Sequence, residues 1–256
     1  MKNDFLKKIT TRGKAIYLAY DHGMEHGPED LPGKSVDPTF ILDIAMQGEY
    51  NAVILGKGLA EKYYKDSIYE MKVPLILKLN GKANIWKGGD LFSRQNCSVE
   101  YAKELGASAV GYTIFLGSAH DEEMFAEFGK IVEEAHHNKM AAIAWVYPRG
   151  EFVKDETSPE ITAYAARVGL ELGADMVKIK YCGSTGNFKK VVEAAGKAKV
   201  VLSGGPILER EEEFLGVVRS VILAGGIGAA VGRNVWQNPK PLEFTKRIKD
   251  VIFENQ

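Results

Sequence analysis

Eight short apolar runs recur along the 256-residue chain at intervals of about 30 residues, the length of one strand with its crossover helix. Most runs are followed by a polar or glycine-rich turn and then by a segment with helical periodicity. The number of these units and the length of the chain predict an α/β fold, a (β/α)8 TIM barrel that forms a single domain over residues 1–256. The runs cover residues 15–20, 52–55, 74–79, 109–116, 141–147, 176–180, 200–202 and 229–231.

The clearest helical patterns cover residues 38–47, 121–138, 159–172 and 211–223, with a weaker one at residues 93–105. Ser158, Pro159 and Glu160 make a typical helix start, with a capping hydroxyl, a proline at the first helical position and an acid near the positive end of the helix dipole. Residues 22–38 form a loop longer than most connections from a strand to its helix. In a barrel such loops border the active site.

The balance of charged residues limits the kinds of partner that the chain can bind. The chain carries 33 Lys and Arg against 34 Asp and Glu, a net charge of −1, so we expect it to bind neither nucleic acid nor a membrane. The N-terminus turns polar too early for a secretory signal, which predicts a cytoplasmic protein. Cys97 and Cys182 follow no disulfide or metal-binding pattern.

The sixth run alternates apolar residues with Lys178 and Lys180. In a parallel sheet covered by helices both ammoniums would point inward, which is costly for structure alone. At about 6 Å their repulsion is roughly 2 to 3 kcal/mol, or about two pKa units, and burial acts in the same direction. One lysine can therefore be a neutral amine near pH 7, as Schiff-base chemistry requires. The alternative is that each lysine binds a carboxylate or a phosphate, and the spacing does not choose between the two lysines.

Other reactive side chains lie near the ends of neighbouring runs. Tyr147 is suited to moving a proton and Trp145 to covering a delocalised intermediate, although both also fit an aromatic core pair. Arg149 is compatible with a phosphate ligand or with solvent. Asp21 is compatible with a substrate hydroxyl or with a role in capping a turn.

The two glycine-rich segments after the seventh and eighth runs predict a phosphate site, because these loops form the recurrent phosphate site of the fold. The alternative is a pair of tight turns without a ligand. The predicted phosphate-binding residues are Ser203, Gly204, Gly205, Gly232 and Arg233. Weaker candidates for a second phosphate are Lys57, Lys62, Lys78 and Lys82.

His22 and His26 are four residues apart, a spacing that can bind a metal from one face of a helix. Gly23, Gly27 and Pro28 make a helix unfavourable there, and the sequence offers no third ligand at metal-binding spacing. We therefore expect no metal site.

In combination these motifs resemble the archaeal-type class I fructose-1,6-bisphosphate aldolases. The matching segments LAYDHGMEHGP, WVYPRG, VKIKY, SGGP and VGRNVWQ run in the family's order from residue 18 to residue 237. The resemblance implies an enzyme of glycolysis and gluconeogenesis that needs neither metal nor cofactor. Its lysine forms a Schiff base with fructose 1,6-bisphosphate, which is cleaved reversibly into dihydroxyacetone phosphate and glyceraldehyde 3-phosphate. The resemblance also implies a high-order homo-oligomer, often a decamer.

The resemblance assigns the Schiff base to Lys178, with Lys180 as the group that keeps it neutral. It assigns proton donation to Tyr147 and stabilisation of the intermediate to Trp145. Asp21 would contact the hydroxyl involved in carbon–carbon cleavage. The remaining residues would bind substrate: His22 and His26 at the same end, Arg149 at the phosphate remote from the lysine, and Ser203, Gly204, Gly205, Gly232 and Arg233 at the phosphate of dihydroxyacetone phosphate.

Three other functions fit the same residues. A related lysine-dependent synthase with transaldolase- or transketolase-like chemistry, or a thiolase acting on a phosphorylated dione, would share the paired lysines and the YPRG segment. A barrel that binds a sugar phosphate without catalysis is the second possibility, and a metal-dependent aldolase is the third.

Overall fold

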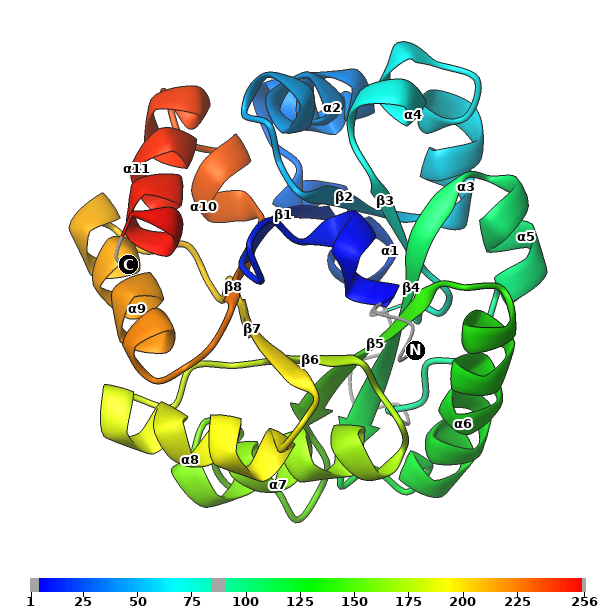
Figure 1. Ribbon diagram of the computed structural model, residues 1–256, viewed down its shortest axis with the longest axis vertical. Helices are drawn as coiled ribbons and strands as arrows, with labels where there is room; N and C mark the ends of the chain where they lie inside the picture. Colours follow the sequence, from blue (N-terminus) through cyan, green and yellow to red (C-terminus); the bar gives the residue numbers. More distant parts are fainter. Residues whose placement is uncertain (1–4, 84–90, 255–256) are drawn as a thin grey trace.

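The computed structural model describes residues 5–83 and 91–254, in which eight parallel strands form a closed barrel in sequence order (Figure 1). The first strand pairs with the second and the eighth, which closes the ring. The predicted (β/α)8 barrel is confirmed. The strands are β1 (Ala15–Tyr20), β2 (Ala52–Gly56), β3 (Leu75–Lys78), β4 (Ala107–Leu116), β5 (Ala141–Pro148), β6 (Met176–Ile179), β7 (Lys199–Ser203) and β8 (Gly228–Val231).

The helices surround the ring of strands, except that α1 lies over the ring in the view of Figure 1. The principal covering helices are α2 (Pro38–Gln47), α5 (Val99–Glu104), α6 (Asp121–His137), α7 (Pro159–Glu171), α8 (Thr185–Ala195), α9 (Glu211–Leu223) and α11 (Pro241–Phe253). The short helical turns are α1 (Gly23–His26), α3 (Lys57–Leu59), α4 (Ile68–Lys72) and α10 (Arg233–Trp236), with the 3-10 turns η1 (Phe5–Ile9), η2 (Pro28–Asp30) and η3 (Gly33–Val36) and the π-helical turn η4 (Ala60–Tyr64).

Local sequence signals place the helix boundaries well in α7 and less well in α5. The Ser158 hydroxyl accepts a hydrogen bond from the Ile161 amide, and Pro159 begins α7 as predicted. The predicted helix at 93–105 is too long, because only Val99–Glu104 is helical. The carbonyl of Ser93 instead accepts a hydrogen bond of 2.8 Å from the Asn80 amide, which holds that part of the chain away from helical geometry.

Two apolar cores follow from the alternation of side chains along the strands. The larger core lies between the strands and the helices, as expected for a parallel sheet with its outer face covered. The smaller core fills the inside of the barrel and includes Tyr17, Ile76, Trp145 and Met176. Ile9 from η1 belongs to the same inner core, so the reactive side chains described below rest on a packed floor.

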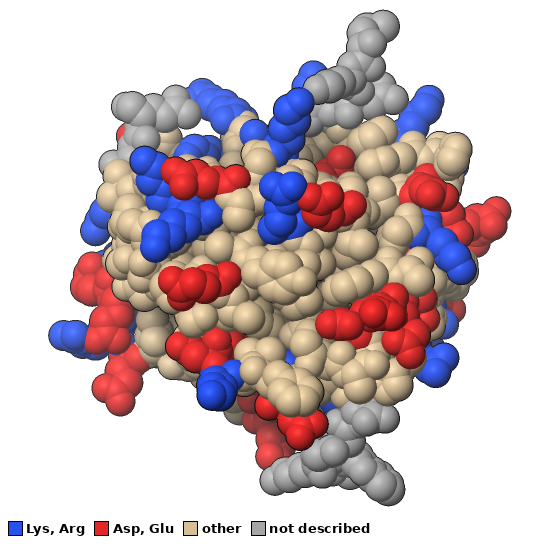
Figure 2. Space-filling model, turned by 90° about the horizontal axis from the view of Figure 1, so that it is seen from below, with Lys and Arg blue, Asp and Glu red and all other residues tan. Residues whose placement is uncertain are grey.

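The surface carries charges of both signs. On the face shown in Figure 2, acidic and basic side chains alternate among the coloured residues rather than forming one continuous field. None of the helices in the described ranges has the length and apolar character needed to span a membrane. Cys97 and Cys182 are both buried free thiols.

Candidate active site

A cavity of about 370 Å³ opens at the C-terminal ends of the strands, where barrel enzymes place their chemistry. It brings together the predicted site residues except Trp145, which is buried in the inner core, and except Lys57, Lys62 and Lys82 among the weaker phosphate candidates, which line other cavities. The predicted residues that line it are Asp21, His22, His26, Tyr147, Arg149, Lys178, Lys180, Ser203, Gly204, Gly205, Gly232 and Arg233. It is also lined by Glu25, Lys78, Thr113 and Glu156, which the sequence did not single out for these positions.

Lys178 points into this cavity from β6, and only 6% of the residue is exposed. Its ammonium lies 5.2 Å from the centre of the Trp145 ring, on the neighbouring strand β5 at the same register. Burial and the nearby Lys78 ammonium together lower the pKa of Lys178 to about 8, although the Asp21 and Glu25 carboxylates partly oppose the shift. A useful fraction of the side chain is therefore a neutral amine near pH 7.

Lys180, which is predicted to keep Lys178 neutral, forms an ion pair in this structure. Its ammonium pairs with Glu156 at 2.5 Å, and both lysines line the same cavity. Burial lowers the pKa of Lys180, against the effect of Glu156. The cation that lowers the pKa of Lys178 here is Lys78. Lys78 is therefore a second candidate for this electrostatic role, and the role of Lys180 stays a prediction.

Lys78 forms a buried ion-pair cluster with two residues that follow β1. Its ammonium lies 2.6 Å from the Glu25 carboxylate and 3.3 Å from that of Asp21. Burial alone would raise the pKa of Asp21, but Lys78 and Lys178 lower it to about 2, so Asp21 is ionised. The sequence gave Lys78 only as a weak phosphate candidate. The alternation of side chains along β3 could have placed Lys78 inside the barrel. Ile76 belongs to the inner core, and Lys78, two residues later, points the same way.

Trp145 is held in place by the absence of a side chain on the adjacent strand. A Cβ on Gly111 of β4 would lie 1.5 Å from the Trp145 ring. The indole nitrogen of Trp145 and the hydroxyl of Thr113 are both buried, and neither has a hydrogen-bond partner among the described residues. Unpaired polar groups in an apolar core lower the stability of the fold. Thr113 pairs in register with Trp145 on the next strand, and Trp145 pairs with Lys178 on the strand after that.

Tyr147 and Ser203 connect β5 to β7 across the cavity. Their hydroxyl oxygens lie 3.2 Å apart. Burial raises the pKa of Tyr147, and the negative charges of Asp21 and Glu25 act in the same direction. The phenol therefore keeps its proton at neutral pH and is available as an acid.

His22 precedes the one-turn helix α1 and His26 is its last residue, although the sequence had argued against a helix here. Both the Glu25 and the His26 amides donate to the His22 carbonyl, and Gly27 with φ 78° ends the turn. The glycines thus shorten the helix rather than prevent it. Burial lowers the pKa of His22 to about 4, so the ring is neutral. Within the described ranges, no group of three or more His, Cys, Asp or Glu side chains is arranged to hold a metal ion.

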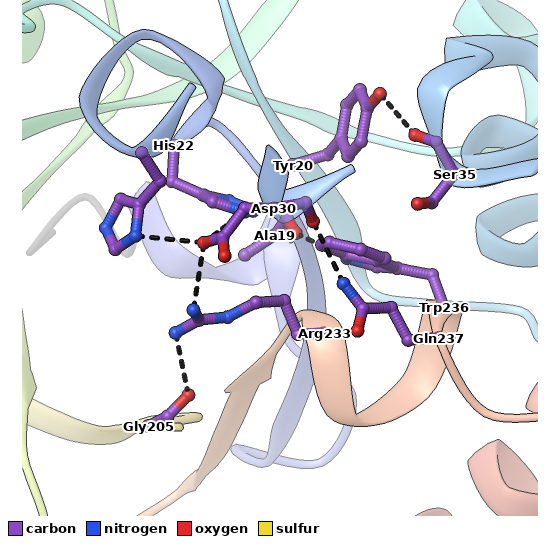
Figure 3. Close-up of polar contacts among 10 residues, drawn as sticks. Ala19, Tyr20, His22, Asp30, Ser35, Gly205, Arg233, Trp236 and Gln237 are labelled. Carbon is purple, nitrogen blue, oxygen red and sulfur yellow. Dashed lines mark hydrogen bonds and ion pairs between the residues drawn. The ribbon is translucent and has the colours of Figure 1, made fainter. Parts of the chain in front are cut away.

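Asp30 links the loop after β1 to the start of α10. One of its carboxylate oxygens lies 2.9 Å from both His26 Nδ1 and Arg233 Nη1. Figure 3 shows the Arg233 guanidinium between Asp30 and the Gly205 carbonyl, which accepts from Nη2 at 3.4 Å. The Gln237 amide donates to the Asp30 carbonyl at 2.9 Å. Arg233 is therefore oriented over the loop that follows β7.

The backbone beside Arg233 is closely packed. A Cβ on Gly204 would lie 2.8 Å from the Ala230 carbonyl, so this glycine permits the β7 and β8 ends to approach each other. Gly205 has φ 67°, a conformation that favours glycine. The Asn234 amide donates to the Gly204 carbonyl at 3.2 Å. Glycines, a serine and an arginine thus surround one end of the cavity, as a phosphate site requires.

Arg149 marks another part of the cavity rim. Its Nε donates to Glu156 at 3.0 Å, and its guanidinium lies 5.7 Å from the centre of the Tyr147 ring. Two cation-rich regions therefore lie around Lys178, one with Arg149 and Lys180 and the other with Arg233.

Comparison with known proteins agrees with this geometry. The DeoC/LacD family aldolase model matches residues 15–238. A class 1 fructose-bisphosphate aldolase of Thermoproteus tenax is 49% identical over 251 residues, covering 97% of this chain and 93% of that protein. A Methanocaldococcus jannaschii protein named fructose-bisphosphate aldolase/6-deoxy-5-ketofructose 1-phosphate synthase is 34% identical and covers 98% of this chain and 86% of its own length.

Solved structures show the same relationship. The crystal structure of an archaeal fructose 1,6-bisphosphate aldolase superposes with a TM-score of 0.93 at 47% identity, covering 99% of both chains. An archaeal fructose-1,6-bisphosphate aldolase with its catalytic lysine covalently bound to the carbinolamine intermediate gives 0.92 at 47% identity, covering 98% of both. The chain therefore belongs to the DeoC/LacD aldolase family and, within it, to the archaeal-type class I fructose-bisphosphate aldolases.

Proposed function

We propose that this chain is a Schiff-base aldolase that reversibly cleaves fructose 1,6-bisphosphate into dihydroxyacetone phosphate and glyceraldehyde 3-phosphate. The observation that carries the proposal is the buried Lys178, whose pKa is lowered to about 8 in a cavity that Arg149, Lys180 and Arg233 also line. A neutral amine attacks a carbonyl, and the imine that forms serves as the electron sink. This chemistry uses neither a metal nor a separate cofactor.

Lys178 first forms the covalent intermediate. Its nitrogen attacks C2 of the open-chain ketose, and the resulting carbinolamine loses water to give a protonated imine. The Trp145 ring, 5.2 Å from the lysine nitrogen, places its electron-rich face near the cation that develops. Trp145 therefore stabilises the charged intermediate and excludes water from one side of it.

Cleavage then breaks the bond between C3 and C4. Solvent water accepts the proton of the C4 hydroxyl, the C3–C4 electron pair moves to the imine, and glyceraldehyde 3-phosphate leaves with an enamine remaining on Lys178. Asp21 is the ionised carboxylate available for this hydroxyl, with its pKa lowered to about 2. A carboxylate with so low a pKa is a weak base. We therefore assign Asp21 to orienting and polarising the hydroxyl, and Glu25 lies beside it, paired with Lys78.

Tyr147 completes the reaction by giving its proton to C3 of the enamine. Water then hydrolyses the imine and releases dihydroxyacetone phosphate from Lys178. The hydrogen-bond contact with Ser203 at 3.2 Å orients the phenol from the side of β7. Burial raises the pKa of Tyr147, so the protonated form is present at the start of each cycle.

The two phosphates hold the scissile bond between them. We assign the phosphate of the dihydroxyacetone half to Ser203, Gly204, Gly205, Gly232 and Arg233. The remote phosphate belongs to Arg149, with His22 and His26 lining the cavity. Binding at both ends positions the reacting carbons and contributes to the rate as well as to affinity.

The experiment that tests the proposal combines turnover with covalent trapping. Glyceraldehyde 3-phosphate release from fructose 1,6-bisphosphate should proceed undiminished in EDTA, which separates this reaction from a metal-dependent aldolase. Borohydride reduction with dihydroxyacetone phosphate should add the triose mass to Lys178. Full trapping in a Lys178→Ala variant would overturn the assignment of the Schiff base to Lys178. Turnover of synthase or thiolase substrates without cleavage of fructose 1,6-bisphosphate would show that the enzyme is a synthase or a thiolase instead. Trapping with no turnover of any of these substrates would favour a barrel that only binds.

We also propose that the chain assembles into a high-order homo-oligomer in the cytoplasm. The resemblance to the archaeal-type class I aldolases supports the assembly. Light scattering after size-exclusion chromatography would test this, and a monomer at micromolar concentration would contradict it.

A further inference from the structure

We propose that Glu156 determines the preference of this site among anionic substrates by competing with the remote phosphate for Arg149 and Lys180. The inference rests on the proposed function and concerns a residue to which neither the motifs nor the comparisons assign a role. Glu156 lies in the loop between β5 and α7 and lines the same cavity as its two partners.

The contacts of Glu156 occupy the donors that a phosphate would need. One carboxylate oxygen lies 2.5 Å from Lys180 Nζ, and the other accepts from Arg149 Nε at 3.0 Å. A carboxylate and a phosphate present similar oxygen acceptors to a guanidinium and an ammonium. Without a substrate, the carboxylate therefore takes the place of a phosphate at this end of the cavity.

The two cations have contacts that do not depend on Glu156. The Arg149 guanidinium lies over the rings of both Phe115 and Tyr147, at 5.8 and 5.7 Å. The Lys180 ammonium lies 5.9 Å from the centre of the Tyr147 ring. These aromatic contacts keep both cations at the rim when the carboxylate leaves, so a phosphate can replace it without rebuilding the site.

Glu156 is the exchangeable carboxylate among those that line the cavity. Its side chain is 42% exposed, whereas Asp21 and Glu25 are 8% and 14% exposed and are fixed on the buried Lys78. Asp30, near the other phosphate region, is held by its own carbonyl contact with Gln237 as well as by Arg233. Among the residues that the structure describes, the hydrogen bonds and ion pairs of the Glu156 side chain are made with Arg149 and Lys180.

Competition of this kind reduces the advantage in binding that a second phosphate gives to a substrate. A substrate with two phosphates gains an additional anchor when it displaces Glu156, because its other phosphate already holds it in the cavity. A substrate phosphorylated only at the dihydroxyacetone end has no group to exchange with the carboxylate. Glu156 thus weakens binding of the bisphosphate selectively and leaves the monophosphate unaffected, which lowers the discrimination between them.

The test compares Glu156→Gln with the unaltered enzyme on fructose 1,6-bisphosphate and on fructose 1-phosphate. Removing the competing charge should lower KM for the bisphosphate by about three- to tenfold, since one exposed carboxylate contact is lost from the free enzyme. The kinetic constants for fructose 1-phosphate should stay within about twofold. Glu151→Gln removes the same charge from an exposed position in the same loop and should change neither substrate.

A double-mutant cycle separates competition from a structural role. In a Lys180→Met background, Glu156→Gln should lower the bisphosphate KM by a smaller factor, because one of the two cations that Glu156 occupies is then absent. An unchanged ratio of the two KM values, a raised bisphosphate KM, or parallel losses on both substrates would overturn the proposal.

If Glu156→Gln does not fold, Lys180→Met alone decides, since it must raise KM for the bisphosphate and not for the monophosphate. If the unaltered enzyme cleaves neither ketose phosphate, the proposed function fails; cleavage of both without the selective shift rejects the role of Glu156 alone.

Discussion

The ring of Trp145 occupies the volume that a side chain at Gly111 would fill, since a Cβ there would lie 1.5 Å from the indole. Gly111 is on β4 and Trp145 on β5, so the contact is made across neighbouring strands inside the barrel. The missing side chain fixes the indole beneath Lys178, which is 5.2 Å from its ring centre.

Gly111→Ala should therefore displace the indole or the strand and impair both stability and chemistry. We expect a loss of about 1 to 3 kcal/mol in the free energy of unfolding, as for other overpacked cores, and a shift in tryptophan fluorescence. Gly129→Ala is the matched control, because a Cβ on this α6 residue meets nothing within 4 Å. The control should be neutral or stabilising, since alanine favours helix. Equal stability of the two variants would contradict the packing argument.

Apart from a replacement of Lys178 itself, Lys78→Met should reduce stability and activity more than any other single replacement of a lysine. It leaves the buried carboxylates of Asp21 and Glu25 without their cation, and breaking such a cluster costs about 3 to 5 kcal/mol. Because Lys78 also lowers the pKa of Lys178, the pH at which the Schiff base forms should move upward. Chemical denaturation and the pH dependence of trapping measure the two effects.

The exposed Lys72→Met provides the comparison for Lys78, with the same chemical change at the surface before β3. Its stability and pH dependence should match those of the unaltered protein. A Lys78→Met variant that retains both would show that the cluster is dispensable.

The pH dependence of imine formation should follow Lys178. Its pKa is lowered to about 8, so the neutral fraction, and with it the initial rate of borohydride trapping, rises about tenfold per pH unit below 8 and levels off above 9. Asp21, with a pKa of about 2, stays ionised throughout this range and adds no second step. Stopped-flow trapping between pH 6 and 10 measures the midpoint; a midpoint near 10.5 would mean that burial does not perturb the lysine.

Tyr147→Phe should separate covalent binding from turnover. The variant retains Lys178 and its environment, so trapping with dihydroxyacetone phosphate should persist. It loses the proton donor, and kcat should fall by about 10² to 10⁴, the usual contribution of such a group. Ser203→Ala removes the hydroxyl 3.2 Å from the phenol and one contact to the phosphate, so it should raise KM and lower kcat far less than Tyr147→Phe does. Full turnover in Tyr147→Phe would require a different acid.

The fold was predictable because its periodicity is carried by local sequence. The strand Ala15–Tyr20 and the helix Pro38–Gln47 have the predicted bounds, and the spacing of the apolar runs specified the order of the strands. Strand ends then indicated which side chains would meet at the rim. Ser93 shows the limit, because the side-chain amide of Asn80, just after β3, holds it out of the predicted helix.

The electrostatics of the site were less predictable, because they depend on pairs that have no sequence period. Lys178 and Lys180 were treated as a pair because they are two residues apart, yet Lys180 pairs with Glu156 from a loop. The cation that acts on Lys178 is Lys78, a hundred positions earlier. Only the closed ring brings β3 and β6 to the same cavity, so no local pattern reveals this pairing.

The loop after β1 is fastened by residues from the far end of the chain. Trp236 donates to the Ala19 carbonyl across a separation of 217 residues, and Gln237 to the Asp30 carbonyl across 207. During synthesis the first strand leaves the ribosome long before either partner exists. The emerging polypeptide therefore carries its reactive lysine without the framework that surrounds it, and catalytic competence is acquired in one late step, when the turn at α10 becomes free to dock.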